Sequence, residues 1–229
     1  MKLAFISDIH SNIHALSEVL KKIEEFKIDE IFCCGDIVGY NSFPKECLDL
    51  VRDIKIKSVV GNHDLAVVDK KFSWFKETCA MGIKHSIENL EHCDIKFLNN
   101  LDFELSFVRD GISFYMCHGS PRDKLFEYIH PWFTDDILSD IVKNVNADYI
   151  ITGHTHIQME AAVGSQVILN PGSVGQPRDG IAKSCFMIFD TVDLKTNWYR
   201  VDYNIKSATE AVLKANLPAI FIEKLIQGK

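Results

Sequence analysis

The sequence predicts an α/β fold in which two mixed β-sheets pack face to face with helices outside, as a four-layer αββα sandwich. Short apolar runs rich in Val, Ile and Phe alternate with helical patterns up to residue 160, and strands dominate after that. No repeat, charged tail or Pro/Gly/Ser-rich linker divides the chain, so we expect one domain over residues 1–229. A chain of 229 residues with 47% apolar residues can bury a substantial core.

The N-terminal part of the chain indicates strands that alternate with amphipathic helices. After the first apolar run, apolar residues recur at spacings of three and four, and Ser11 and Asn12 are available as helix caps. Proline suits the first turn of a helix, so Pro44 predicts a helix start. The expected elements are a strand at 2–6, a helix at 13–26, a strand at 30–34, a helix from Pro44, a strand at 57–60 and a helical segment within 74–91.

The C-terminal part contains more strands than helices. Asp110 and Gly111 suit the positive φ angles of a tight hairpin, which predicts antiparallel strands on either side of them. Thr134 is a candidate cap for a helix with one apolar stripe. The expected elements are strands at 105–108 and 112–116, a helix from Thr134 to Val145, a strand at 148–151, about four short strands within 158–203 and two final helices, the second opened by Pro218.

The composition excludes several classes of protein. No apolar run approaches the roughly 18 residues that a membrane-spanning helix needs, so we expect no membrane as partner. The first apolar run ends at Ser7, which is too short for a secretory signal. The seven cysteines show no repeated spacing, which argues against a disulfide framework. We therefore expect a cytoplasmic protein with reduced cysteines.

Candidate metal ligands follow five of the expected strands at the point where each strand ends. The carboxyl ends of parallel strands meet at one edge of a sheet, so these side chains are expected to converge. Glycines beside them allow sharp turns and close approach of other groups. The polar residues are Asp8 and His10 after the first strand, Asp36 after the second, Asn62, His63 and Asp64 after the third, His118 after the hairpin, and His154 and His156 after the strand at 148–151.

The spacing and chemistry of these residues favour a site for two metal ions. Asp8 and His10 are two positions apart, as are His154 and His156, and in an extended segment both members of each pair project to the same side. Carboxylate, amide and imidazole donors together suit manganese, iron or zinc better than calcium. Seven donors exceed what one ion uses, and they fit two ions that share a carboxylate.

These motifs together resemble the calcineurin-like metallophosphoesterase superfamily. Longer strings resemble a small prokaryotic, phosphodiesterase-like branch of it, and the resemblance covers nearly the whole chain. Each motif alone is weak, but five in the family's order are specific. The resemblance rests on Asp8 and His10 and on residues 35–40, 61–64, 117–121, 153–156 and 170–180.

The resemblance implies a ligand set and a reaction. Asp36 would bridge the two ions, which we expect to be manganese, although iron, nickel or zinc also fit. A hydroxide that bridges both ions would attack phosphorus, and His63, oriented by Asp64, would act as general acid on the leaving oxygen. Asp8, His10, Asp36 and His156 would hold one ion, and Asp36, Asn62, His118 and His154 the other.

The sequence indicates the substrate-binding residues less specifically than it indicates the metal ligands. Arg178 lies in a Pro- and Gly-rich segment that suits a structural turn. We slightly favour this structural interpretation over one in which Arg178 binds a phosphate through two hydrogen bonds. Four further residues in loops would either form a rim that stacks on a base or aryl group, or pack structurally. They are Tyr40, Asn41, Tyr128 and Trp132.

The net charge bears on the partner. A formal charge of −7 argues against a long nucleic acid, which needs clustered Lys and Arg. Two divalent ions offset by Asp8 and Asp36 still attract a small phosphate ester. We therefore expect a hydrolase, favour a phosphodiesterase for small esters, and leave the oligomeric state open. The alternative is a non-catalytic, metal-binding scaffold of the same fold, which the resemblance disfavours because the scaffold-type member lacks the equivalent of His63.

Overall fold

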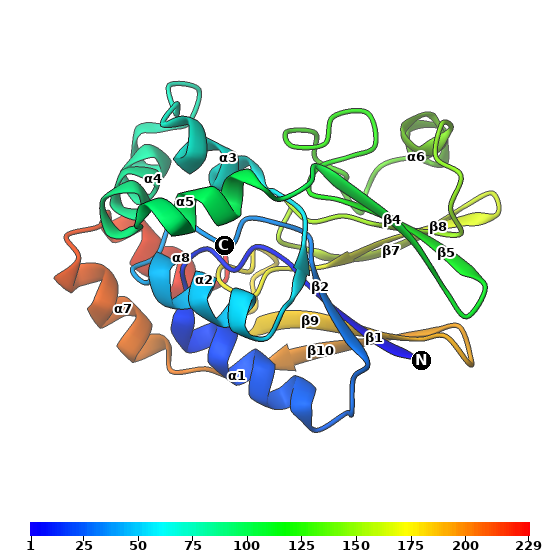
Figure 1. The fold of residues 1–229 in the computed structure, drawn as a ribbon, viewed down its shortest axis with the longest axis horizontal. Helices are drawn as coiled ribbons and strands as arrows, with labels where there is room; N and C mark the ends of the chain where they lie inside the picture. The colour runs from blue at the N-terminus through cyan, green and yellow to red at the C-terminus, as the bar shows by residue number, and fades with distance from the viewer.

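Two five-stranded mixed sheets form the centre of the molecule, as the computed structural model of residues 1–229 shows (Figure 1). Across the first sheet, the strands are β10 (Lys195–Val201), β9 (Ser184–Asp190), β1 (Lys2–Ile6), β2 (Glu30–Cys33) and β3 (Lys57–Ser58). Across the second, they are β4 (Glu104–Arg109), β5 (Ile112–Cys117), β6 (Tyr149–Ile151), β8 (Gln166–Pro171) and β7 (Gln158–Val163). The predicted pair of mixed sheets is confirmed.

The helices cover the two sheets unequally (Figure 1). One core cluster joins β1 and β9 of the first sheet to five helices: α1 (Ile13–Glu24), α2 (Pro44–Asp53), α3 (Asn62–Asp69), α4 (Glu77–Asn89) and α5 (His92–Asn99). The second sheet packs against a single helix, α6 (Asp135–Val142). The chain ends with α7 (Ile205–Lys214) and α8 (Ala219–Gln227), whose buried faces pack on Tyr40. No helix is both long enough and apolar enough to cross a bilayer.

Three adjacent strands of each sheet are parallel, and this directs their carboxyl ends to one edge. In the first sheet β1 pairs with β2, and β2 with β3. In the second sheet β5 pairs with β6, and β6 with β8. The Nδ1–H of His118, just after β5, donates to the Cys34 carbonyl, just after β2, at 2.8 Å. The two edges therefore meet, and the loops that follow the strands face a common space.

Alternation along β1 separates the inner core from the outer one. Leu3 and Phe5 face the second sheet, whereas Ala4 and Ile6 face the helices. Phe114 of β5 lies between the sheets, and its ring centroid is 6.2 Å from that of Phe5. Burial of such aromatic side chains holds the sheets face to face.

Several expected boundaries differ from the structure. Strand β3 ends at Ser58, because Val59 bridges to Asp102 and the N–H of Val60 donates to the Asp102 carbonyl. The expected helical segment at 74–91 is a helix only over Glu77–Asn89. Thr134 lies at the N-cap of α6 without a side-chain bond to the helix, which ends at Val142 and not Val145.

Helices α3 and α5 were not expected. Each is eight residues long. In each, an aspartate in the first turn accepts a hydrogen bond from the backbone N–H of the residue just before the helix. In α3 the Asp64 carboxylate accepts from Gly61, and in α5 the Asp94 carboxylate accepts from Glu91, both at 3.0 Å. Short helices with weak apolar periodicity leave little signal in a sequence.

Removing the Phe114 ring is expected to destabilise the fold. Phe114 is 1% exposed and contacts aromatic rings from both sheets, so Phe114→Ala leaves a cavity that the sheets cannot close. We expect a loss of about 3–5 kcal/mol in the free energy of unfolding, measured by urea denaturation. Phe103, which is 48% exposed, is the control, and Phe103→Ala should cost at most about 0.5 kcal/mol. Equal losses in the two variants would contradict this packing arrangement.

Candidate metal centre

Seven buried side chains bring oxygen and nitrogen atoms together where the two sheet edges meet. All are at most 5% exposed. Their carboxylates and imidazoles form overlapping groups in which the candidate donor atoms lie within 4.8 Å of one another, and the group of His10 and Asp36 also includes His63. All seven residues expected from the sequence as metal ligands converge here: Asp8, His10, Asp36, Asn62, His118, His154 and His156.

The first group combines one carboxylate with two imidazoles. The Nε2 atoms of His10 and His156 lie 3.1 Å apart. Asp8 Oδ1 lies 3.2 Å from His156 Nε2 and 3.7 Å from His10 Nε2. The other oxygen of Asp8 accepts hydrogen bonds from the Ser7 hydroxyl at 2.7 Å and the His154 backbone N–H at 3.1 Å. One oxygen of this carboxylate is therefore held by the protein, and the other faces the imidazoles.

The second group combines two imidazoles with an amide oxygen. His118 Nε2 lies 2.9 Å from Asn62 Oδ1 and 3.0 Å from His154 Nδ1. The ring of Tyr128 stacks on His154 with centroids 3.9 Å apart. This stacking restricts the rotation of the His154 ring and keeps its Nδ1 directed at His118.

The carboxylate of Asp36 lies between the two groups. Its Oδ2 is 3.6 Å from His10 Nε2 in the first group and 3.4 Å from His118 Nε2 in the second. Its Oδ1 accepts from the backbone N–H of His63 at 2.8 Å. A Cβ on Gly61 would overlap this carboxylate, so residue 61 has to be glycine for Asp36 to occupy this position. One oxygen is thus available to two cations.

Three imidazoles are held in one tautomer by the backbone. A carbonyl only accepts hydrogen bonds, so each of these Nδ1 atoms carries its proton, and each ring presents a bare Nε2 to the centre whenever it is neutral. The bonds run from His10 to Val38 (3.2 Å), from His118 to Cys34 (2.8 Å) and from His156 to Gln176 (2.5 Å).

The polar atoms of this centre fit a pair of divalent cations. Burial lowers the pKa of His10 and His156, so both rings are neutral near pH 7 and their Nε2 lone pairs face each other. Asp8 Oδ1 is buried and makes no hydrogen bond. Such an arrangement costs free energy unless a positive charge lies between the atoms. Imidazole, carboxylate and amide donors are those that manganese, iron, nickel and zinc accept.

The charges of the carboxylates reinforce this fit. Burial raises the pKa of Asp36, but His118, His63 and His10 outweigh burial and hold it well below its usual range. Burial likewise lowers the pKa of His118, yet the charge of Asp36 outweighs it and raises the pKa to about 9. Asp36 is therefore ionised, and it attracts whichever cation or proton occupies the centre.

The backbone at the ligands is left-handed, which corrects the expectation that these pairs sit in extended segments. The turns are held by hydrogen bonds from the N–H groups of Asp8 and His10 to the carbonyls of Gly35 and Asp36, at 3.0 and 2.9 Å. A positive φ costs a residue with a side chain about 1–3 kcal/mol, so the surrounding structure has to enforce it. The residues concerned are Asp8 (52°), His10 (47°), Asp36 (54°), His154 (67°) and His156 (61°).

His63, the expected catalytic residue, lies beside the first group with a free nitrogen. Its ring centroid is 4.8 Å from that of His10 and 4.6 Å from that of Tyr40. Its Nδ1 is buried without a hydrogen-bond partner. A Cβ on Gly39 would lie 2.5 Å from this Nδ1, so glycine at residue 39 leaves room for the ring. Burial lowers the pKa of His63 to about 4, so the ring is neutral in the free protein.

Asp64 was expected to orient His63 directly, and the structure shows a different arrangement. Its carboxylate accepts from the backbone N–H groups of Val38 and Gly61, each at 3.0 Å, and makes no bond to the His63 ring. Burial, followed by the charge of Asp36, raises the pKa of Asp64 to about 7. Asp64 therefore joins the loop after β2 to the start of α3 and positions His63 only through the backbone.

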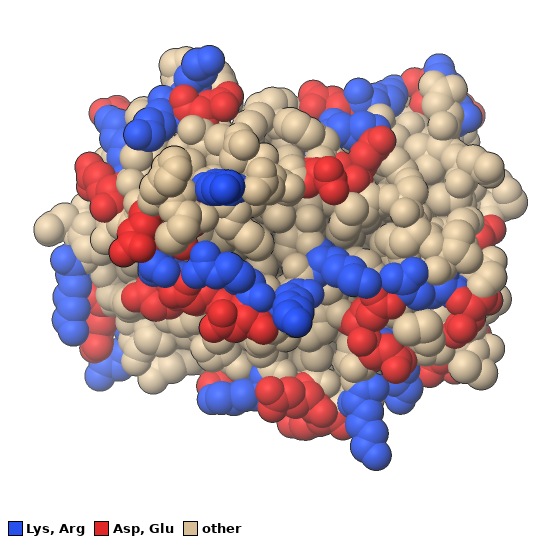
Figure 2. All heavy atoms as spheres, in the orientation of Figure 1, with Lys and Arg blue, Asp and Glu red and all other residues tan.

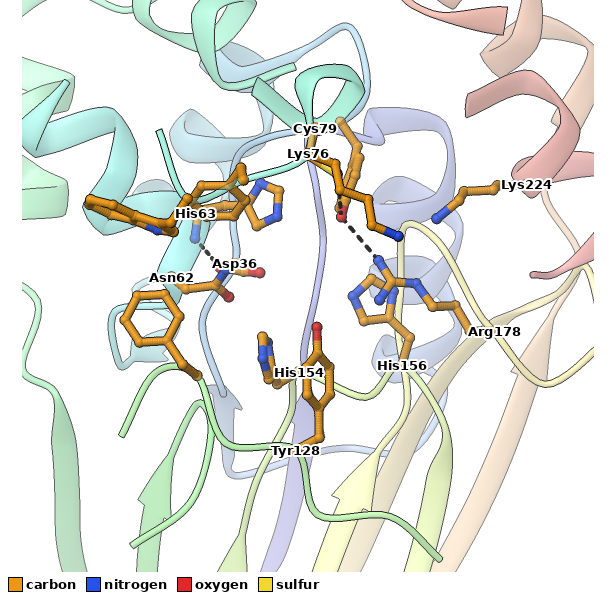
Figure 3. A pocket seen from close by; sticks show the side chains of 14 residues that line it. Asp36, Asn62, His63, Lys76, Cys79, Tyr128, His154, His156, Arg178 and Lys224 are labelled. Carbon is orange, nitrogen blue, oxygen red and sulfur yellow. Dashed lines mark hydrogen bonds between the residues drawn. The ribbon is translucent and has the colours of Figure 1, made fainter. Parts of the chain in front are cut away.

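A cavity of about 350 Å³ opens over the two groups (Figure 3). Both candidate substrate residues, Arg178 and Tyr40, line it. Tyr40 also packs on Phe221 of α8, so it has a structural contact as well. Tyr128 lines the cavity, whereas Asn41 is buried with its amide on the His10 carbonyl and Trp132 lies outside the lining.

Six further lining residues were not expected from the sequence. They come from the segment just before and at the start of α4, from the loop after β5 and from α8. None lies in a motif, and only tertiary packing brings these segments over the candidate metal ligands. They are Trp74, Phe75, Lys76, Cys79, Phe126 and Lys224.

Comparison with known proteins identifies the family of this fold and site. The sequence profile of the calcineurin-like phosphoesterase superfamily domain matches residues 1–194. The chain belongs to the calcineurin-like phosphoesterase superfamily. The seven buried donors of the centre all lie within the matched range.

Three relatives show how far the similarity extends. An uncharacterised protein of Methanocaldococcus jannaschii is 37% identical over 244 residues, which cover 99% of this chain and 98% of that protein. A phosphodiesterase of the same organism is 23% identical over 172 residues, or 75% of this chain and 83% of that protein. The crystal structure of a metallophosphoesterase from Sphaerobacter thermophilus covers all of both chains with 28% identity and a TM-score of 0.83.

Loss of the Asp36 carboxylate is expected to deplete both metal positions. Asp36→Asn removes the negative charge that faces both imidazole groups. After manganese loading and desalting, metal analysis should find well below one ion per chain in this variant and two in the unmodified protein. Asp202, whose side chain is 80% exposed, provides the control, and Asp202→Asn should retain two. Two tightly held ions in Asp36→Asn would rule out the shared position of this carboxylate.

Proposed function

We propose that the protein is a dinuclear, metal-dependent phosphodiesterase that hydrolyses small phosphate esters. The observation that carries this proposal is the position of Asp36 Oδ2, which faces an imidazole of each group at 3.4 and 3.6 Å. A shared carboxylate between two donor groups is what a pair of catalytic cations requires. Membership of the calcineurin-like phosphoesterase superfamily and the relative named a phosphodiesterase support the reaction class.

The net charge of the loaded centre favours an anionic substrate. When bound, two divalent ions lower the pKa of water and stabilise negative charge on phosphoryl oxygens. Asp8 and Asp36 offset two of the four positive charges, so about two remain at the floor of the cavity. Elsewhere, Lys and Arg side chains are interspersed with Asp and Glu on the face shown in Figure 2. This mixed surface, with a net charge of −7, favours a small ester over a long nucleic acid.

His63 is the residue we assign to the leaving group. It lies in the wall of the cavity, beside His10 of the first donor group. The ring is neutral in the free protein, and an anionic phosphoryl group beside it favours the protonated form. His63 then donates a proton to the leaving oxygen, or a hydrogen bond to the phosphoryl group in transfer.

The size and lining of the cavity suit a small ester with a flat group. A volume of about 350 Å³ lies within the usual range for small-molecule sites. Exposed rings of Trp74, Phe126 and Tyr128 contribute to the lining, and such rings stack on a base or an aryl group. A nucleotide or a cyclic phosphodiester meets both conditions.

Replacement of His63 is expected to separate metal binding from turnover. His63→Ala should keep two ions per chain, because the ring lies outside the donor groups that we assign to the ions. Turnover of a diester with a poor leaving group, such as a dinucleotide, should fall about 10²–10⁴-fold. The loss should be smaller for bis-p-nitrophenyl phosphate, whose leaving group needs little protonation. His92→Ala, at the exposed start of α5, is the control. Unchanged turnover of the dinucleotide would remove His63 from the mechanism.

A substrate panel tests the reaction class itself. The purified protein is stripped with a chelator, reloaded with manganese and offered phosphodiesters, cyclic nucleotides and phosphomonoesters. We expect hydrolysis of diesters, and no hydrolysis before the metal is restored. Inactivity on every member of the panel would favour the alternative, a metal-binding scaffold.

A further inference from the structure

Three cationic side chains converge on one side of the cavity without acidic partners. Lys76 precedes α4, Arg178 follows β8, and Lys224 lies on α8, so they come from distant parts of the chain. Figure 3 shows their charged ends directed toward one another. None of the three makes an ion pair with a carboxylate, although twenty ion pairs, histidine contacts included, form elsewhere. In a protein with net charge −7, an unpaired cluster of this kind inside a cavity needs an explanation.

The groups that contact these cations are neutral. Arg178 Nη2 donates to Tyr40 Oη at 3.2 Å and to Gln176 Oε1 at 3.1 Å, and its Nε is buried without a partner. Lys224 Nζ and the Arg178 guanidinium each lie 5.7 Å from the centroid of the Tyr40 ring. Because these contacts leave the positive charges uncompensated, the cluster has free capacity for an anion.

Each of the three cations has an acidic neighbour in the chain, Glu77, Asp179 or Glu223, but none of these carboxylates forms an ion pair with the cluster. Asp179 follows Arg178 directly, but its carboxylate accepts from Arg200 Nη1 at 3.2 Å. Burial, followed by the charge of Arg178, lowers the pKa of Lys224, as expected where cations lie close together and repel one another. Cations held together against this repulsion are typical of a binding site for an anion.

Helix α8 supplies Lys224 and fixes its position in this cluster. Residues 195–229 lie beyond the part of the chain that the superfamily profile matches. Phe221 of α8 contacts the Tyr40 ring edge-on, with centroids 5.2 Å apart, and Leu225 is buried beside it. The N–H of Gly180 donates to the Gly228 carbonyl at 2.7 Å, which ties the Arg178 loop to the end of α8. The position of Lys224 relative to Arg178 is therefore fixed by packing.

The scissile group alone does not account for so much positive charge. The loaded metal centre keeps about two positive charges, which already balance the attacking hydroxide and the single charge of a phosphodiester. Lys76, Arg178 and Lys224 add three more on one wall of the same cavity. We infer that these three residues form a second anion subsite, which holds a terminal phosphate of the substrate while its diester bond lies over the metals.

This inference rests on the proposed function and narrows it. The substrate class becomes a small phosphodiester that carries a further phosphomonoester, such as a 5′-phosphorylated dinucleotide. Arg178 offers its guanidinium to two phosphate oxygens, and the lysines supply point charges around the third. The C-terminal helices then act as a specificity element added to the shared catalytic domain.

The test compares two substrates that differ only in the terminal phosphate, pTpT and TpT. We expect the unmodified, manganese-loaded protein to prefer pTpT by at least about 10-fold in kcat/KM, through KM. In a variant with both Lys76→Gln and Lys224→Gln, this preference should fall below about 3-fold. Lys224→Arg should keep it, because the charge is retained. Lys206→Gln, on an 87% exposed side chain of α7, is the matched control and should also keep it.

A binding measurement gives a readout that does not depend on turnover. Calorimetric titration of the metal-loaded His63→Ala protein with the same two dinucleotides should show tighter binding of pTpT. The same titration after Lys76→Gln and Lys224→Gln should show equal affinities. Thermal denaturation confirms that these variants are folded.

Three outcomes would contradict the inference. Equal kcat/KM and equal affinity for the two substrates in the unmodified protein would overturn the subsite. Parallel losses on pTpT and TpT in the lysine variant would also overturn it, because the cations would then serve the scissile phosphate. A preference that survives loss of both lysines would overturn their assignment. Failure to hydrolyse any diester is a different result, which contradicts the proposed function and leaves the calorimetric comparison to decide the subsite.

Discussion

The rest of the site depends on one buried carboxylate placed where the edges of two sheets meet. Asp36 follows β2 of the first sheet, yet its Oδ2 lies within 3.6 Å of imidazoles that follow β1 and β5. This position requires glycine at residue 61, whose missing Cβ leaves space for the carboxylate. It also requires that the sheets pack face to face with their parallel strands directed the same way. The apolar layer between the sheets, to which Phe5 and Phe114 belong, therefore fixes the geometry of the polar centre.

The centre stores strain that the free protein does not relieve. Five of the seven proposed ligands have positive φ, each at a cost of about 1–3 kcal/mol. Asp8 Oδ1 has no hydrogen bond, and the bare Nε2 atoms of His10 and His156 lie 3.1 Å apart. Cations bound between these atoms would remove the repulsion and would coordinate the free oxygen. Binding of the ions and stability of these loops are thus linked, as they are in other metal sites.

The sequence predicted which residues converge at the site better than it predicted their local conformation. The donors were found because their types recur where apolar runs end, and most strands followed from apolar runs and turn residues. The paired ligands were expected in extended segments, but Asp8 and His154 turn into left-handed conformations that loop hydrogen bonds impose. Asp64 was expected to contact His63 and instead binds backbone N–H groups. Nothing in the sequence marked Lys224 as a site residue, because only the packing of α8 on Tyr40 brings it to the cavity.

The central claim is that two ions share the Asp36 carboxylate, and a crystal structure of the manganese-loaded protein tests it most directly. Anomalous diffraction at the manganese edge locates each ion independently of the protein atoms. We predict two peaks about 3.5–4 Å apart, one beside His10 and His156 and the other beside His118 and His154, with Asp36 in contact with both. A single peak, or two peaks of which only one contacts Asp36, would contradict the claim.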